Sequence, residues 1–183
     1  MKIFEIGVMK TGTTSLGKAY EILGFKHMGW NPALHAEWKQ DRLENIFNTI
    51  DEYEAFEDGP WRNIDFMLLD SRYPNSKFIL LERDNDSWIK SLEYHCSPKY
   101  NVNEVTPQYL DVQWIENRSA QIERELEYKE RKYKTVKEYF RNRPDDLLVM
   151  NISEGWTPLC NFLGCPQPTC PFPKINVSHT VRK

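Results

Sequence analysis

A short apolar segment that runs straight into a glycine- and threonine-rich turn most constrains what this chain can fold into. Residues 3–8 (IFEIGV) have the length and apolar character of a buried strand. The turn MKTGTTS at residues 9–15 follows, and a helical pattern then continues to about Leu23, with Gly24 as its C-terminal cap. A strand that enters a helix through such a turn is typical of a parallel α/β sheet.

The rest of the chain alternates strands with helices in the same way. The continuous apolar run at residues 77–82 is the clearest strand, and such runs are typical of the centre of a parallel sheet. Residues 108–142 are heavily charged with a narrow apolar stripe, which indicates one long helix or a broken pair. Shorter strands are predicted at residues 53–56 and 147–150, and helices at residues 36–50, 61–73 and 156–163 and from a cap at Asp84 or Asp86 to about His95. The pattern therefore predicts an α/β fold with a mainly parallel central sheet flanked by helices.

Length and composition favour a soluble protein with a single domain. The 183 residues suit one domain at residues 1–183, and the 40% hydrophobic content excludes disorder throughout. The formal net charge of −3 gives no reason to expect nucleic acid as a partner. No apolar run approaches the roughly 20 residues that a membrane span needs, and the N-terminus lacks a signal-peptide pattern. We therefore expect a cytoplasmic protein that is a monomer or a homodimer.

The four cysteines fit a reducing compartment. Cys160, Cys165 and Cys170 are evenly spaced, and a zinc site with His179 as the fourth ligand is conceivable. Zinc-binding cysteines usually come as closer pairs, so the spacing favours reduced thiols and no metal.

Residues 9–15 are the first candidate binding site. Backbone N–H groups at a helix N-terminus favour an anion, and Gly12 allows the chain to wrap closely around it. Threonine and serine hydroxyls add hydrogen-bond donors, and Lys10 adds a positive charge. Lys10 precedes Gly12, whereas a Walker A loop has its lysine after the second glycine. The pattern predicts a phosphate or sulfate site, with a simple helix cap beside a solvated lysine as the alternative.

Two more strand ends carry polar residues that would face the same crevice. Arg83 closes the clearest strand, and Ser91 lies eight residues further on, about two helical turns above it. Arginine suits a phosphate, which indicates a second anion site. Glu57 and Asp58 follow another short strand and could take a proton from an acceptor hydroxyl. Asp58 could equally cap the helix that follows it.

Together these segments resemble the sulfotransferase family that uses 3′-phosphoadenosine 5′-phosphosulfate (PAPS). The sequence KTGTTS at residues 10–15 is similar to the family's 5′-phosphosulfate loop, and residues 83–91 are similar to its 3′-phosphate signature. Residues 154–164 and 172–176 resemble the tail of its compact members, so the likeness runs from residue 3 to about residue 176. The resemblance implies a three-layer P-loop-like fold and transfer of a sulfuryl group from PAPS to an acceptor hydroxyl or amine.

The resemblance also implies a role for each residue of the two anion sites. Lys10 would stabilise the charge that builds on the departing phosphate, and Arg83 with Ser91 would hold the 3′-phosphate of PAPS. The scheme requires no metal. The residues that would bind the 5′-phosphate are Thr11, Gly12, Thr13, Thr14 and Ser15.

For the catalytic base, the resemblance points to a histidine or an acidic residue after the strand that precedes the arginine-bearing one. Asp58 lies at that place and is the first choice, with Glu57 second and His27 third. The acceptor would be a small molecule or a glycan, and its identity stays open, since sugars, lipids, phenols and peptides all offer hydroxyls.

The chain departs from the family pattern in two places. Many relatives carry a tryptophan after the Thr-Thr pair to stack on the adenine, whereas Ser15 stands there in this chain. The family's basic segment near the C-terminus has no clear match, with Arg182 and Lys183 as candidates. The tryptophans that could stack on the adenine instead, each of which is also a candidate core residue, are Trp30, Trp61 and Trp156.

Two other functions stay open on the sequence. A non-catalytic relative could keep the fold and bind the nucleotide without transferring the sulfuryl group. A small P-loop kinase is the other alternative, and the absence of the GK[ST] order in residues 9–15 disfavours it.

Overall fold

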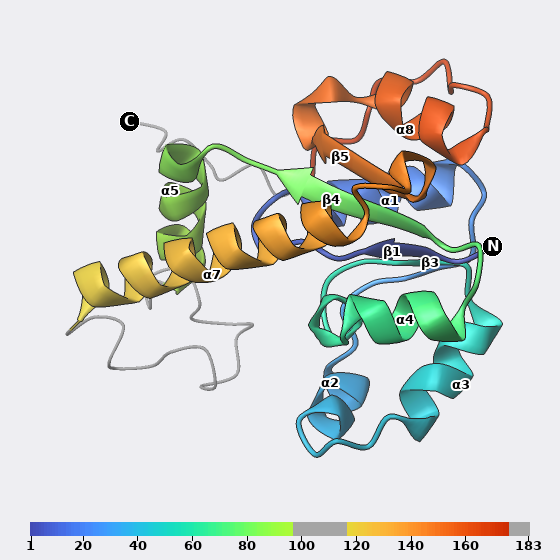
Figure 1. Ribbon diagram of the computed structural model, residues 1–183. Coiled ribbons are helices and arrows are strands. Elements are labelled where there is room, and N and C mark those ends of the chain that lie inside the picture. Colours follow the sequence, from blue (N-terminus) through green and yellow to red (C-terminus); the bar gives the residue numbers. More distant parts are fainter. Residues whose placement is uncertain (97–116, 176–183) are drawn as a thin grey trace.

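The computed structural model describes residues 1–96 and 117–175 and contains a five-stranded sheet in the order β2-β3-β1-β4-β5 (Figure 1). Every pair of neighbouring strands is parallel. The strands are β1 (Ile3–Glu5), β2 (His27–Met28), β3 (Ala55–Phe56), β4 (Lys77–Glu82) and β5 (Leu147–Asn151). Because β1 is central, the loop that follows it lies between the loops of the other strands.

Helices cover both faces of the sheet. On one face α1 and α8 pack against the strands, and on the other face the core is formed with α3, α4 and α7. The helices of the described ranges are α1 (Thr13–Ile22), α2 (Pro32–Trp38), α3 (Glu44–Glu52), α4 (Phe66–Arg72), α5 (Asn85–Cys96), α7 (Arg118–Tyr139) and α8 (Trp156–Leu163), with the short 3-10 helices η1 (Trp61–Asn63), η2 (Pro144–Asp146) and η3 (Ile152–Glu154). The predicted three-layer α/β architecture is confirmed.

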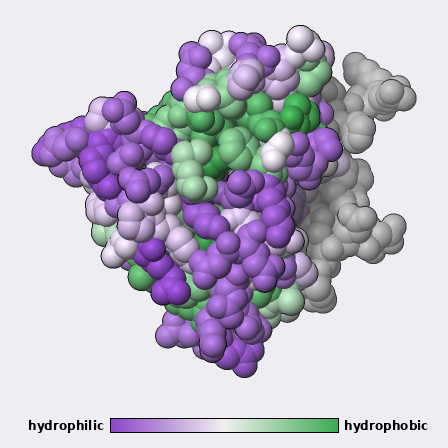
Figure 2. All heavy atoms as spheres, turned by 90° about the vertical axis from the view of Figure 1, so that its right-hand side faces the viewer, coloured by the Kyte–Doolittle hydropathy of each residue, from purple (hydrophilic) through white to green (hydrophobic). Residues whose placement is uncertain are grey.

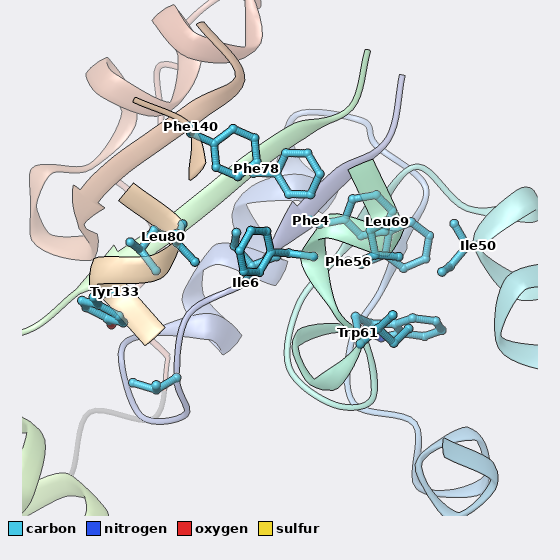
Figure 3. Packing of buried hydrophobic residues seen from close by; sticks show 14 of the residues in the cluster. Phe4, Ile6, Ile50, Phe56, Trp61, Leu69, Phe78, Leu80, Tyr133 and Phe140 are labelled. Atoms are coloured by element: carbon cyan, nitrogen blue, oxygen red, sulfur yellow. The ribbon is translucent and has the colours of Figure 1, made fainter. Parts of the chain in front are cut away.

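A row of aromatic rings holds three neighbouring strands together on the α3–α4–α7 face (Figure 3). The register aligns Phe4 with Phe56 on one side and with Phe78 on the other, at ring separations of 5.2 and 5.8 Å. Phe140 extends the row from Phe78 at 4.9 Å, and Trp61 extends it from Phe56 at 4.9 Å. These buried rings set the positions of β3, β1 and β4, whose carboxyl ends carry the candidate site residues.

Two predicted helices are broken in the structure, so the predictions of single helices at residues 36–50 and 61–73 are wrong. The first is divided into α2 and α3, because Asp41 adopts a φ of 55° and donates its N–H to the carbonyl of Trp38. The second is divided into η1 and α4, because Ile64 is extended. Asp65 then starts α4 by accepting a hydrogen bond from the backbone of Met67 at 3.0 Å. In both places the turn chemistry of one aspartate overrides the apolar spacing.

Other boundaries differ less. The strand predicted at residues 53–56 is confined to β3, and the two-residue strand β2 was not predicted. Asp84 caps α5 through a 2.8 Å hydrogen bond from the backbone of Ser87, which decides between the two predicted caps. Helix α7 confirms a helix within the predicted 108–142 segment, of which residues 108–116 lie outside the described residues.

Figure 2 shows the end of the molecule at which the strands begin, where hydrophilic residues cover most of the surface around one hydrophobic area. None of the helices in the described ranges is long and apolar enough to cross a membrane. The strands run away from this end, so their carboxyl ends lie on the opposite side of the molecule.

The cysteines that the structure describes carry free thiols. Cys160 is buried in α8, and burial raises its pKa to about 11. Cys165 is half-buried and Cys170 is exposed. Within the described ranges no group of three or more metal-ligating side chains is assembled, and His179 lies outside those ranges.

Two carboxyl side chains are buried where β1 and β3 end. Glu5, the last residue of β1, is fully buried, and Glu57, which comes directly after the neighbouring strand β3, is also buried. Burial raises the pKa of Glu5 to about 8 and the charge of Glu57 adds to this rise, although Arg62 and a 2.8 Å hydrogen bond from the backbone of Gly7 act against it. In the folded protein Glu5 is therefore mostly protonated at neutral pH.

The raised pKa of Glu5 predicts that the protein loses stability as pH rises. Between the usual pKa of 4.5 and the folded-state pKa of about 8, the folded protein holds a proton that the unfolded chain has released. Glu5→Gln copies the neutral carboxyl, so its melting temperature should match the wild type at pH 5 and exceed it at pH 8. Circular dichroism melting at both pH values checks this, and a wild type that is more stable than the variant at pH 8 would contradict it.

Candidate active site

A cavity of about 830 Å³ lies at the carboxyl end of the sheet and is lined from the loops after all of its strands. Trp30 follows β2, Asp58 follows β3, and Lys10 follows the central strand β1. Arg83 follows β4, and Ser153 lies in the short helix after β5. Ligands of parallel α/β sheets bind at this edge, so the cavity is the candidate active site.

The loop after β1 lines the cavity along its whole length from residue 9 to residue 15. Lys10 and Gly12 have φ angles of 66° and 113°, and this turn brings the first turn of α1 to the cavity. The N–H groups of a first helical turn have no partner within the helix, and with the helix dipole they favour an anion. The loop can therefore hold a phosphate or sulfate group through its backbone.

Two hydroxyls of this loop bind the protein's own backbone. Thr11 donates to the carbonyl of Val8 at 2.9 Å, which closes the loop on itself. Ser15 accepts a 3.0 Å hydrogen bond from the backbone of Ile175 and thereby holds the C-terminal segment against the cavity. Their side chains therefore shape the site, while Thr13 and Thr14 also line it.

Arg83 and Trp88 join the loop after β4 to the loop after β1. The Nη1 of Arg83 donates to the carbonyl of Lys10 at 3.0 Å, and its Nε donates to Ser87 Oγ at 2.9 Å. The indole of Trp88 donates to the carbonyl of Met9 at 2.8 Å. The two predicted anion sites are thus parts of one hydrogen-bonded unit, and Ser91 lines the same cavity.

A buried lysine of α7 binds the loop after β4. Lys129 is 6% exposed and donates from Nζ to the carbonyl of Arg83 at 2.7 Å and to Asn85 Oδ1 at 2.8 Å. The same ammonium lies 4.8 Å from the ring of Trp88, a distance that suits a cation–π contact. Burial lowers the pKa of Lys129, so these contacts offset part of the cost of burying its charge.

Asp58 faces the cavity as one half of an ion pair. It has a φ of 64° and accepts a 2.8 Å hydrogen bond from the backbone of Gly59. The same carboxylate oxygen lies 3.3 Å from the Nε of Arg62, which also lines the cavity. The contact is an ion pair by distance, and this Nε makes no well-aligned hydrogen bond within the described residues. Arg62 therefore offsets the charge of the carboxylate, while the N–H of Gly59 binds it.

The structure does not bring Glu57 and His27 into the cavity lining. Glu57 Oε1 lies 3.6 Å from His27 Nε2, and both side chains are largely buried. They pack against α1 at Gly17, where a Cβ would come within 2.9 Å of this nitrogen and 3.0 Å of Glu57 Oε1. Of the three predicted base candidates, only Asp58 shares the cavity with Lys10.

Several cavity residues were not singled out from the sequence. Arg62 carries a detectable signal, because it stands four residues after Asp58, a spacing that suits a carboxylate–guanidinium pair. His95 lines the cavity from α5, and burial together with the charge of Lys10 lowers its pKa, so its imidazole is neutral at pH 7. Lys174 brings a positive charge from the C-terminal segment, whereas residues 182–183 lie outside the described ranges.

The three tryptophans proposed for stacking have different surroundings. Trp61 and Trp156 are buried core residues. Trp30 is exposed and lines the cavity. Phe172, which was not considered, also lines the cavity and packs edge-on against Trp156 at 4.7 Å.

Gly12→Ala is expected to destabilise the protein more than Gly24→Ala. Both glycines have positive φ angles, 113° and 86°, so each alanine introduces strain of roughly 1–2 kcal/mol. A Cβ at Gly12 would also come within 2.8 Å of the Ile152 side chain, whereas nothing lies within 4 Å at Gly24. Urea unfolding should show the larger loss of stability for Gly12→Ala. Equal losses in the two single variants would contradict the close packing.

Comparison with known proteins identifies a family for this chain. The sequence matches the family described as "Sulfotransferase domain" over residues 2–181. It is also 27% identical over 215 residues to the "Ava biosynthesis cluster protein M" of Aspergillus versicolor, an alignment that covers 97% of this chain and 82% of that protein. Since the family match includes every strand and the whole described cavity, the chain belongs to the sulfotransferase-domain family.

Proposed function

We propose that this protein is a sulfotransferase that moves a sulfuryl group from PAPS to an acceptor hydroxyl or amine. The observation that carries the proposal is that the two predicted anion sites, in the loops after β1 and β4, are joined by the Arg83–Lys10 hydrogen bond and line one cavity. A donor with two separated phosphate groups suits such a pair. Membership of the family supports a transferase.

The donor-binding residues belong to the central and β4 parts of the cavity. The backbone from Gly12 to Ser15, with the hydroxyls of Thr13 and Thr14, would hold the 5′-phosphate. Arg83 and Ser91 would hold the 3′-phosphate, which distinguishes PAPS from ATP. Lys174 adds a positive charge to the same lining. PAPS would supply the activated sulfuryl group.

Lys10 and Asp58 would act on opposite sides of the transferred group. The acceptor oxygen forms a bond to sulfur while the bond from sulfur to the 5′-phosphate oxygen breaks, and the bonding electrons leave with adenosine 3′,5′-bisphosphate. The ammonium of Lys10 offsets the negative charge that builds on this leaving group. The carboxylate of Asp58, which lies beside Arg62, takes the proton of the acceptor. Catalysis then depends mainly on positioning and charge stabilisation, as in phosphoryl transfer.

His95 is a second group in the cavity that can accept a proton. Its lowered pKa leaves the imidazole in the neutral form, which accepts a proton, at pH 7. Asp58 follows β3 and lies beside Arg62, whereas His95 comes from α5, so the two can be separated by mutation.

Arg83→Met is expected to weaken binding of adenosine 3′,5′-bisphosphate by roughly 10- to 100-fold, because a charge-assisted hydrogen bond contributes about 1.5–3 kcal/mol. Arg83 also supports Lys10, so Ser91→Ala is the cleaner variant. Ser91→Ala should weaken binding of the bisphosphate and leave the affinity for 5′-AMP unchanged, as measured by isothermal titration calorimetry. Equal losses for both nucleotides would contradict the 3′-phosphate assignment, and tighter binding of ATP by the wild type would favour a kinase.

Lys10→Met and Asp58→Asn are expected to lose turnover while they still bind adenosine 3′,5′-bisphosphate. Loss of a general base typically costs about 10²- to 10⁴-fold in rate. Chromatography of the bisphosphate formed from PAPS, with a panel of phenols, alcohols and sugars as acceptors, measures this. His95→Gln is the matched variant, and loss in His95→Gln with none in Asp58→Asn would move the base to His95. A wild type that binds the bisphosphate but forms no product would support a non-catalytic relative.

A further inference from the structure

The strand order divides the cavity into two halves on either side of Lys10. The strands β4 and β5, with Arg83 at the end of β4, lie on one side of the central strand β1. The strands β2 and β3, which lead to Trp30 and Asp58, lie on the other side. The donor residues proposed above occupy the β1–β4 half. In-line transfer brings the acceptor from the side opposite the leaving group, which is the β2–β3 half.

Trp30 offers a flat apolar surface in this half. It lines the cavity and is 43% exposed, whereas Trp61 and Trp88 are fully buried and Trp156 is nearly so. Among the tryptophans that the structure describes, Trp30 alone is exposed to this degree. A large apolar ring in the wall of a cavity is a common way to bind a ligand ring.

The backbone around Trp30 is held on both sides by the loop after β3. Asn31 donates its N–H to the carbonyl of Gly59 at 3.0 Å. The indole of Trp61 donates to the carbonyl of Gly29 at 2.8 Å. These two bonds fix the residues before and after Trp30 to the loop that carries Asp58.

The ring of Trp30 is supported as firmly as its backbone. The imidazole of His35 lies 4.7 Å from it and is itself 5.2 Å from Trp38. The ring also meets Gly59, where a Cβ would come within 2.6 Å of the indole. A ring held in this way loses little freedom when a ligand stacks on it, so its binding surface is pre-organised.

We infer that Trp30 is the platform on which the acceptor stacks, and that the acceptor is a phenol, with its reactive hydroxyl carried by a flat aromatic ring. The inference rests on the proposed function. Offset stacking on Trp30 places such a ring in the half of the cavity that holds Asp58, the proposed base. The platform therefore positions the hydroxyl for loss of its proton.

The charges around Trp30 favour a phenol over an aliphatic alcohol or a sugar. A phenol has a pKa of roughly 10, whereas an alcohol hydroxyl resembles water at about 15.7, so a carboxylate takes the proton of a phenol more readily. Arg62 and Lys10 line the same cavity and stabilise developing phenolate charge. A sugar would need several partners for its hydroxyls, whereas the single hydroxyl of a phenol needs only a proton acceptor and a nearby positive charge, which Asp58 and Arg62 supply in this half of the described cavity.

The test measures binding of 2-naphthol to the complex of the protein with adenosine 3′,5′-bisphosphate by isothermal titration calorimetry. Trp30→Ala should lower the affinity for 2-naphthol by about 10-fold or more. Trp30→Phe, which keeps an aromatic ring, should retain most of the wild-type affinity. Methyl glucoside and cyclohexanol are the matched probes and should bind weakly with no dependence on Trp30. The affinity for the bisphosphate itself should be the same in all three proteins.

Each other result overturns the inference in a distinct way. Unchanged 2-naphthol affinity in Trp30→Ala would remove Trp30 from the acceptor site, and an equal loss of bisphosphate affinity would make it an adenine platform. Binding of methyl glucoside that depends on Trp30 would indicate a sugar acceptor. If Trp30→Ala does not fold, nuclear Overhauser effects between 2-naphthol and the indole of Trp30 in the wild type test the same contact. We expect to observe them, and their absence would overturn the inference. Absence of bisphosphate binding to the wild type would instead contradict the proposed function.

Discussion

The arrangement of the site depends on the hydrogen bonds that join the loop after β1 to the loop after β4. Arg83 donates to the carbonyl of Lys10, and Trp88 donates to that of Met9. From the far side, Lys129 of α7 holds the carbonyl of Arg83. Because these carbonyls are bonded, the loops after β1 and β4 keep a set separation, as the proposed recognition of two phosphate groups on one ligand requires.

Packing beneath the loops and local strain within them complete this geometry. The stacked rings of Phe56, Phe4 and Phe78 align the strands from which the loops emerge. Lys10 and Asp58 both have positive φ angles that residues other than glycine rarely adopt, and both line the cavity. Such strain persists only where the surroundings hold it, and it gathers at functional sites. The fold therefore holds in place both Lys10, which would stabilise the leaving group, and Asp58, the proposed base.

Features with a strong local signal could be predicted from the sequence, and features set by one contact could not. The apolar run of β4 and the turn after β1 predicted the sheet and the edge at which the cavity lies, because parallel strands end at the same edge. The break at Asp41 escaped prediction, since one residue in a left-handed conformation interrupts an otherwise helical pattern. Trp30 was one of three tryptophans considered for the site, and the structure singles it out through a hydrogen bond between distant segments at Gly59. The place of Lys174 escaped prediction, because it depends on the hydrogen bond between Ile175 and Ser15.

In the proposed complex one cavity receives both phosphates of the donor nucleotide and leaves the β2–β3 half open to an acceptor. A crystal structure with adenosine 3′,5′-bisphosphate tests this arrangement. We expect the 3′-phosphate against Arg83 and Ser91, the 5′-phosphate at the first turn of α1, and Trp30 uncovered. A nucleotide with its phosphates exchanged, or one stacked on Trp30, would contradict it.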